Sequence, residues 1–252
     1  MMTPRQAAFR ADYRTRISPW YSGLGHVAVI AVLGLATIWY CARNIASPTL
    51  VEWLVVPAAF IASNIFEWAM HRFIMHRPVK GLMGIYKRHT LAHHQFFTNH
   101  EPRIEGPRDF RITFFPPYAL TTFICMSAAG ALVLAALWSA NAGYFLVATT
   151  SAVYLNYELF HWGCHANDDR LIRHIPFMNT IRRHHIAHHD QAIMMGTNMN
   201  LTYPFADWLF GTSDLDRGLW GHLFNGYDTR FRKQNLTKVR ATAADSRLVP
   251  AE

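Results

Sequence analysis

The sequence predicts an all-α integral membrane protein with four transmembrane helices and a cytoplasmic helical cap that carries a dinuclear metal site. Three observations lead to this fold class: long apolar stretches, a one-sided distribution of basic residues, and histidines gathered in short boxes. Charged residues make up only 16% of the 252 residues, below the roughly 25% that is usual in soluble domains. The charge is missing from a few long stretches, which is typical of membrane-spanning segments.

Four apolar stretches are long enough to cross a bilayer as helices. An α-helix rises ~1.5 Å per residue and the hydrocarbon core is ~30 Å thick, so about 20 residues are sufficient. Their charged residues are three glutamates close to the ends: Glu52, Glu67 and Glu158. Buried helices of a soluble protein are the alternative interpretation, but uncharged runs of this length are rare in that class. We predict spans at about residues 23–41, 49–70, 114–138 and 142–160.

The basic residues predict how these helices are oriented. Four arginines precede the first span, eight Lys or Arg lie between the second and third spans, and eleven follow the fourth. Only Arg43 lies on the opposite side. Because Lys and Arg accumulate in cytoplasmic loops, both termini and the histidine boxes are expected in the cytoplasm. The net charge of +8 then reflects a surface that faces anionic headgroups, and no nucleic-acid partner is expected.

The chain divides into three predicted parts. Residues 1–22 form a basic amphipathic N-terminal segment, residues 23–215 the histidine-box membrane domain, and residues 216–252 a cytoplasmic C-terminal tail with a disordered end. The first apolar stretch starts late and lacks a small-residue cleavage site, so it is expected to be a retained span rather than a signal peptide. The three cysteines suggest no disulfide framework.

Eleven of the fifteen histidines fall in four boxes on the predicted cytoplasmic side. A lone histidine in an apolar setting is usually a structural residue, but four boxes on one face indicate metal binding. Since a zinc ion takes three or four protein ligands, this number of imidazoles predicts two ions. Imidazole suits Fe, Zn, Cu and Ni, and the identity of the metal stays open at this point. The candidate ligands are His71, His76, His89, His93, His94, His161, His165, His184, His185, His188 and His189.

The spacing within the boxes predicts which imidazoles share an ion. Residues i and i+4 lie on one face of an α-helix, as His161 and His165 do. His71 and His76 are five residues apart, ~140° around an ideal helix, so this pair requires a helix end or a π-bulge to converge. The other expected pairs are His89 with His93 and His184 with His188, with His94 and His189 turned toward a second ion.

Three polar residues near the boxes are expected to support the ligands. Glu67 and Glu158 share helix faces with the first histidines of two boxes and are expected to accept hydrogen bonds from ligand N–H groups. Ion pairs with nearby arginines are the alternative for both glutamates. Asn198 follows the last box and has either a similar supporting role or a role in a turn. Outside the boxes, His26 begins the first span and is expected at the membrane interface, and three histidines are expected to be ordinary polar residues: His100, His174 and His222.

The boxes resemble those of the fatty acid hydroxylase/sterol desaturase superfamily. Their order H-x4-H, H-x3-HH, H-x3-H, H-x2-HH is matched within residues 60–215, and the stretch Asn198–Thr212 resembles the signature that follows the last box in that family. The second box departs from the pattern H-x2-HH that members often have, because Thr90 stands three residues before His93. In the last box both His184 and His185 are available, and the choice between them stays open.

The resemblance implies a membrane enzyme that uses O2 and two iron ions held by these histidines, with zinc as a substitute in purified protein. The implied reaction is hydroxylation or desaturation of a lipid C–H bond, most directly in a fatty acyl chain. An external electron donor of the ferredoxin or cytochrome b type is expected, since no haem module fits in the remaining length. The competing hypotheses are a zinc-dependent membrane lipid hydrolase and a non-enzymatic metal carrier, although a carrier requires polar residues along its spans.

Overall fold

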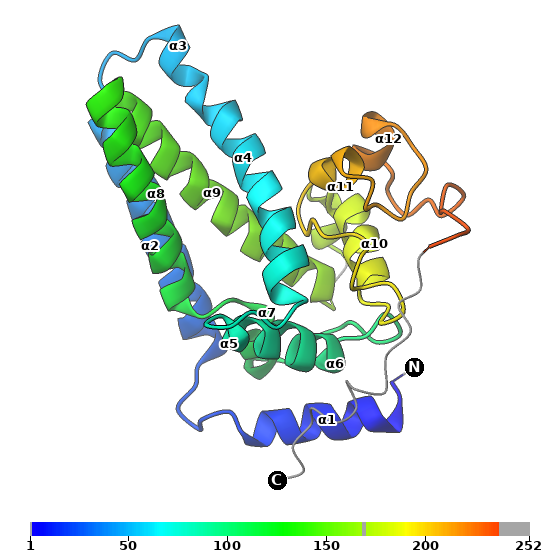
Figure 1. Ribbon diagram of the computed structural model, residues 1–252. Coiled ribbons are helices and arrows are strands. Elements are labelled where there is room, and N and C mark those ends of the chain that lie inside the picture. The colour runs from blue at the N-terminus through cyan, green and yellow to red at the C-terminus, as the bar shows by residue number, and fades with distance from the viewer. Residues whose placement is uncertain (1, 168–169, 237–252) are drawn as a thin grey trace.

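Helices dominate the computed structural model, which describes residues 2–167 and 170–236 of the chain. No β-strand occurs among these described residues, so the all-α prediction is confirmed. Four long helices form a bundle, at the upper left of Figure 1. They are α2 (Gly23–Asn44), α4 (Val55–Met70), α8 (Pro117–Leu137) and α9 (Ala140–His165).

Polar caps fix both ends of this bundle. At one end, the side chain of Ser22 accepts a hydrogen bond from the backbone N–H of Gly25 at 3.0 Å and so caps α2. At the other end, Glu52 lies in the short helix α3 (Leu50–Trp53) and forms a capping box with Thr49. The carboxylate of Glu52 also accepts from Ser139 Oγ at 2.5 Å, which joins α3 to the start of α9. The charge of Glu52 in the second apolar stretch is therefore accounted for by capping.

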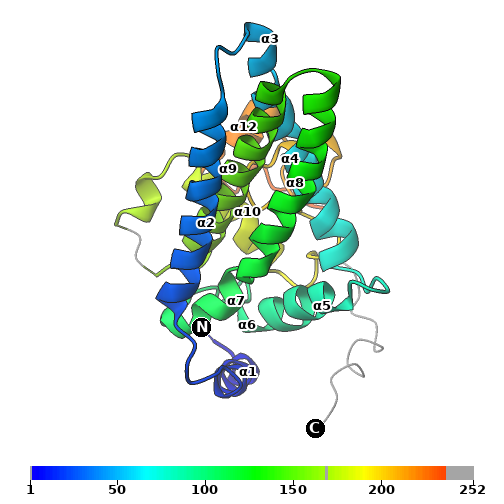
Figure 2. The same cartoon turned by 90° about the vertical axis from the view of Figure 1, so that its left-hand side faces the viewer.

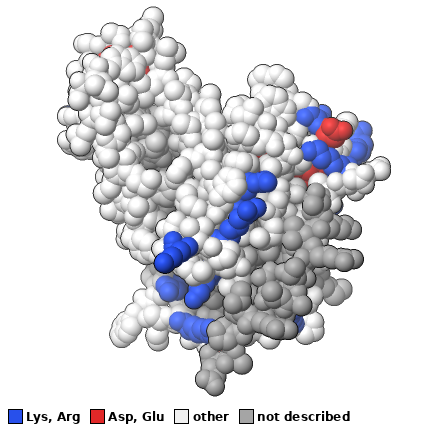
Figure 3. Space-filling model, in the orientation of Figure 1, with Lys and Arg blue, Asp and Glu red and all other residues white. Residues whose placement is uncertain are grey.

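Three segments are long and apolar enough to cross a membrane: Gly23–Asn44, Leu50–Met75 and Pro107–Leu137. They match the first three predicted spans. Side chains such as Leu35 and Leu132 point outward from them and are 59% and 72% exposed, as expected of helices that face lipid. Figure 3 shows the surface of the bundle almost free of charged residues, with Lys and Arg gathered lower on the same face.

Helix α9 differs from the other three long helices. It is helical where the fourth span was predicted, but it does not reach the apolar character of a candidate span. The reason is its position, because α9 packs against α2, α4 and α8. A helix surrounded by protein can carry buried polar residues, and Ser151 and Glu158 are both buried on α9. Three candidate spans are therefore present in the described residues, and the fourth stays a prediction.

The remaining helices lie at one end of the bundle and along one side of it. Helix α1 (Pro4–Thr15) runs across this end and is seen end-on in Figure 2. Two π-helices lie at the same end: η1 (His71–Met75), which directly continues α4, and η2 (Lys87–His93). The other elements are α5 (Met83–Tyr86), α6 (His94–Phe96), η3 (Pro107–Asp109), α7 (Phe110–Thr113), η4 (Ile172–His174), α10 (Met178–His188), α11 (Phe205–Leu209) and α12 (Leu219–Leu223).

Both terminal parts of the described chain are attached to this core. Arg10 of α1 is buried and donates from Nε to the carbonyl oxygen of Phe96 at 2.7 Å, and Arg14 pairs with Asp109 at 2.8 Å. At the other end, the backbone N–H of Lys233 donates to Asp214 O at 2.8 Å. Residues 216–236 thus fold back on the domain, and the disorder predicted after Lys238 falls outside the described residues.

Candidate metal centre

Ten buried histidines converge at the end of the bundle. Nine of them form two groups in which the candidate ligand nitrogens lie within 4.8 Å of one another. His189 joins the second group, because its Nε2 lies 3.0 Å from Nε2 of His185 and 3.2 Å from Nε2 of His93. The first group is His71, His76, His89, His94 and His188; the second is His93, His161, His165, His185 and His189.

Two π-helices set the spacing of the first group. In a π-helix the backbone bond closes from i to i+5, as it does from the N–H of His76 to the carbonyl of His71. The two Nε2 atoms of this pair are 3.1 Å apart, so the predicted need for a π-bulge is confirmed. The second box forms η2, where His89 and His94 are likewise 3.1 Å apart. The predicted pairing of His89 with His93 is therefore wrong, because His93 lies in the other group.

The α-helical boxes supply the other ligands. His161 and His165 of α9 share the second group, as their spacing predicted. In α10, His188 Nε2 lies 2.9 Å from His76 Nε2 and belongs to the first group, whereas His185 belongs to the second. The predicted pairing of His184 with His188 is wrong, since His184 lies outside both groups and its Nε2 is 2.9 Å from Asp207 Oδ2. Of His184 and His185, between which the sequence left a choice, the structure thus places only His185 in a ligand group.

Backbone carbonyls orient the imidazoles. A carbonyl oxygen can only accept, so a Nδ1 atom bonded to one carries the proton and leaves a lone pair on Nε2. This arrangement fixes the ring and directs Nε2 into the group, as a metal ligand requires. The Nδ1 atoms and their acceptors are His71 with Met199 O (2.5 Å), His93 with Ile112 O (3.2 Å), His165 with Pro102 O (2.6 Å), His188 with Thr197 O (2.8 Å) and His189 with Phe97 O (2.7 Å).

The inward-facing nitrogens fit a bound cation. Two Nε2 lone pairs cannot hydrogen-bond to each other, yet His188 Nε2 approaches His76 Nε2 to 2.9 Å, and His93 Nε2 approaches His189 Nε2 to 3.2 Å. Burial, above all, lowers the pKa of His76, His188 and His189 well below its usual value, so these rings are neutral. Neutral imidazole is the form that binds metal. A metal ion between the nitrogens explains the short contacts, and the donor set fits one ion in each group.

The spacing of the nitrogens also bears on the coordination number. Neighbouring Nε2 atoms within the groups are 2.9 to 3.3 Å apart. Ligands at ~2.1 Å from a metal lie ~3.0 Å apart at right angles and ~3.4 Å apart in a tetrahedron. Most of the contacts are closer to the right-angle value, and each group offers five imidazoles. This arrangement suits a metal with five or six ligands better than a four-coordinate structural zinc.

The two groups adjoin each other. The rings of His94 and His189 stack with centroids 4.4 Å apart, and those of His89 and His93 stack at 5.3 Å. Each of these pairs joins one member of the first group to one of the second. No carboxylate belongs to either group in the part of the chain that the structure describes. The two ions would thus share one buried compartment whose ligands are all neutral.

The residues expected to support the ligands contact the backbone of the site instead. Glu67 accepts hydrogen bonds from Thr202, at 2.9 Å from the backbone N–H and 2.6 Å from Oγ1. Glu158 accepts from the N–H of Phe115 at 3.1 Å. Asn198 has a φ of 58°, in the left-handed region that asparagine tolerates, and its side chain donates to His184 O at 3.1 Å and accepts from the N–H of Asp214 at 2.8 Å. The support predicted from these side chains is provided by backbone carbonyls.

Asp207 is a residue of the site that the sequence reasoning missed. It is fully buried and accepts from His184 Nε2, from the backbone N–H of Met199 at 2.9 Å and from that of Asn200 at 2.6 Å. Burial alone would raise the pKa of Asp207, but these hydrogen bonds, His184 first, bring it below its usual value. Since Met199 O holds the ring of His71, Asp207 positions a ligand through the backbone. Asp207 lies within the stretch Asn198–Thr212 that resembles the family signature, and this position was the sequence signal that could have identified it.

The different surroundings of two adjacent histidines give a direct prediction. His185→Gln removes a ligand from the second group and is expected to lower the metal content of the purified protein from two ions toward one. His184→Gln removes only the bond to Asp207, so both ions are expected to remain while the thermal unfolding temperature falls. Elemental analysis of both variants after purification checks this. Loss of metal from the His184 variant alone would contradict the assignment.

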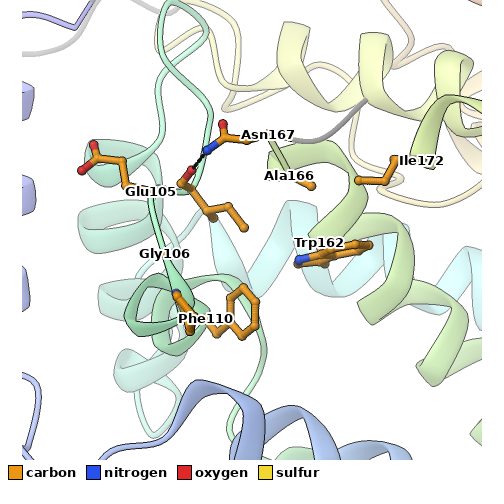
Figure 4. Close-up of a pocket in the computed structure, with 9 residues that line it drawn as sticks. Glu105, Gly106, Phe110, Trp162, Ala166, Asn167 and Ile172 are labelled. Carbon is orange, nitrogen blue, oxygen red and sulfur yellow. Dashed lines mark hydrogen bonds between the residues drawn. The ribbon is translucent and has the colours of Figure 1, made fainter. Parts of the chain in front are cut away.

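The cavity shown in Figure 4 lies beside the C-terminal end of α9, where Trp162 and Ala166 contribute to its lining. It has a volume of about 250 Å³, and Phe110, Trp162 and Ile172 form much of its apolar lining. The side-chain amide of Asn167 donates to the carbonyl of Ile104 at its edge. None of the ten histidines lines this cavity, so it does not open onto either group.

The chain was also compared with known proteins. It matches no protein-family model, no curated protein and no solved structure. The resemblance of its boxes to one superfamily therefore stays a prediction.

Proposed function

We propose that this protein is a membrane oxygenase that uses O2 and two iron ions to hydroxylate or desaturate a C–H bond of a lipid. The observation that supports it most is the pair of buried groups of five imidazoles at the end of a bundle with three candidate membrane spans. A metal centre at the end of membrane helices lies at the level from which a lipid substrate would approach. A fatty acyl chain is the substrate class that we put first.

The proposal includes a topology. Helix α9 is the fourth span, since its 26 residues extend over ~39 Å and its polar residues are sheltered by α2, α4 and α8. With four spans, 23 of the 24 basic residues lie on one side, which places both termini and the histidine groups in the cytoplasm. This side is where a soluble electron donor, a ferredoxin or a cytochrome b-type protein, is available.

The residues have distinct roles in this function. The first group would hold one iron ion and the second group the other, and together the ions would supply the activation of O2 and the electron transfer that side chains lack. The carbonyls of Met199, Thr197 and Pro102 keep the ligand rings in a fixed orientation. Burial of all ten imidazoles excludes bulk water from the ions. The protein then has to place a single carbon of the lipid chain near this centre.

The ligand number favours this function over its competitors. A hydrolytic zinc site has three protein ligands and keeps a position free for the water that attacks the substrate. Five imidazoles for each ion leave less room for that chemistry than for a metal with six coordination positions. A carrier would need ligands that release the ion, whereas these rings are fully enclosed and held by the backbone.

The test is a comparison of lipids from host membranes with and without the protein, grown under air and under ¹⁸O2 and measured by mass spectrometry. Hydroxylation gives a lipid that is heavier by one oxygen atom and carries the isotope, whereas desaturation gives one that lacks two hydrogens. The matched control is the variant in which His188 and His189 are both alanine. A lipid change that persists without O2 would favour the hydrolase. No change with a metal-loaded protein would refute the oxygenase.

A further inference from the structure

A second cavity lies where α2 and α8 begin, at the end of the bundle that carries the histidine groups. Its volume is about 350 Å³. Two arginines, Arg88 and Arg111, line it together with Tyr21, His26 and Trp20. None of the ten histidines of the metal centre belongs to its lining, so it is a separate site.

The two arginines have no carboxylate partner in the described residues, where no ion pair includes either of them. Arg88 uses its Nη2 to donate to the carbonyl oxygens of Phe114, at 2.7 Å, and of Arg111. These acceptors are neutral, as is the hydroxyl of Tyr13, which contacts both guanidinium groups, so no partner of either arginine cancels its charge. Two cations that repel each other in one cavity create a demand for an anion.

The aromatic wall of the cavity is held in place by hydrogen bonds. Nε2 of His26 donates to the carbonyl oxygen of Phe115 at 2.8 Å, so its Nδ1 can accept from the hydroxyl of Tyr21, also at 2.8 Å. The proton of this hydroxyl is thereby used, and Tyr21 serves as a wall rather than as a donor to a ligand. The guanidinium of Arg111 lies over the Tyr21 ring at 5.9 Å. The cavity therefore offers positive charge from the arginines alone.

Its position places the cavity at a membrane boundary. Gly23 and Pro117 are the first residues of α2 and α8, which belong to two of the candidate spans. Trp20 is 94% exposed and Tyr118 is 72% exposed beside these helix starts. Exposed Trp and Tyr at the ends of spans are typical of residues at the level of the lipid headgroups. An anion that reaches Arg88 and Arg111 from this level is most directly part of a lipid.

We infer that this cavity binds the phosphate group of an anionic phospholipid, with Arg88 and Arg111 as its charged contacts. The bound phosphate neutralises the pair of arginines, and the acyl chains of the phospholipid lie along the apolar surfaces of α2 and α8. Because Arg88 immediately precedes His89 in η2, the lipid also stabilises the start of the helix that carries two of the candidate ligands, His89 and His93. The inference does not depend on the proposed oxygenase activity.

The test uses the full-length protein in nanodiscs of phosphatidylcholine with or without phosphatidylglycerol. Lipid retained after extraction is counted by native mass spectrometry, and the thermal unfolding temperature is measured in parallel. Arg111→Gln removes one charge from an exposed side chain and is expected to lower retention of phosphatidylglycerol about tenfold. Arg77→Gln is the matched control, since Arg77 is also exposed and lies over the Phe73 ring at the same 5.9 Å, outside the cavity.

A second variant protects the test against misfolding. Arg88→Gln keeps an N–H donor for Phe114 O while it removes the charge, and it is expected to lose phosphatidylglycerol as Arg111→Gln does. Equal retention in both variants, in Arg77→Gln and in the unmodified protein would overturn the inference. So would a wild-type protein that shows no preference for phosphatidylglycerol over phosphatidylcholine. A thermal shift with inorganic phosphate as large as that with phosphatidylglycerol would identify a free anion as the ligand and refute the lipid.

Discussion

Replacing His188 and His189 together by alanine is expected to remove both metal ions and all metal-dependent activity. The two residues are adjacent on α10 but serve different groups. Nε2 of His188 lies 2.9 Å from Nε2 of His76 in the first group, and Nε2 of His189 lies 3.0 Å from Nε2 of His185 in the second. Each substitution deletes an imidazole from a closed shell and leaves a buried gap next to the remaining rings. Elemental analysis of the purified double variant measures the effect.

The single variants make this prediction specific. His188→Ala should empty the first group while the second keeps its ion, and His189→Ala should do the reverse, so that each purified protein holds about one ion. His222→Ala is the control, because His222 is buried outside both groups and its Nδ1 bonds to Gly218 O. It should keep both ions. Membrane insertion should be unchanged in all variants, since the candidate spans lie elsewhere in the chain. Two ions retained in the double variant would refute the two-group site.

The parts of this molecule that depend on apolar periodicity and residue type could be predicted from sequence. The three candidate spans and the convergence of four histidine boxes follow from composition and spacing alone. The fourth predicted span shows the limit, because the central position of α9 allows polar residues that a lipid-facing helix would exclude. The sequence of α9 is less apolar because α2, α4 and α8 surround it, and this packing is visible only in the structure.

The assignment of ligands to ions could be predicted only in part. The separation of His71 and His76 has no α-helical solution, so spacing predicted a helix end or a π-bulge, and the structure has the π-helix. The second box contains both an i+4 and an i+5 partner for His89, and spacing alone fits either an α-helix or a π-helix. Similarly, the carbonyls that hold Nδ1 atoms come from residues of any type, such as Met199 and Phe97. No side-chain pattern marks such acceptors.

Asp207 connects a metal ligand to the backbone that holds it, and its replacement by alanine is expected to have the second large effect. Its carboxylate accepts from the N–H groups of Met199 and Asn200, from His184, and from Thr212 Oγ1 at 2.5 Å. Asp207→Ala leaves the buried donors of Met199, Asn200 and His184 without this acceptor, at a cost of about 1–3 kcal/mol for each one that finds no water. That total is a large part of the ~5–15 kcal/mol by which folded domains are usually stable. We expect a lower unfolding temperature and a loss of metal.

The order in which the two ions are lost shows whether Asp207 positions His71 or stabilises the fold as a whole. Met199 O orients only His71, a ligand of the first group, so Asp207→Ala should empty the first group before the second as a chelator is titrated. Asp207→Asn retains one acceptor oxygen and should lie between the wild type and the alanine variant in both readouts. Asp216→Ala, an exposed aspartate in the following segment, is the control and should behave as the wild type. If both ions leave together at the same chelator concentration, Asp207 stabilises the fold as a whole and has no particular link to His71.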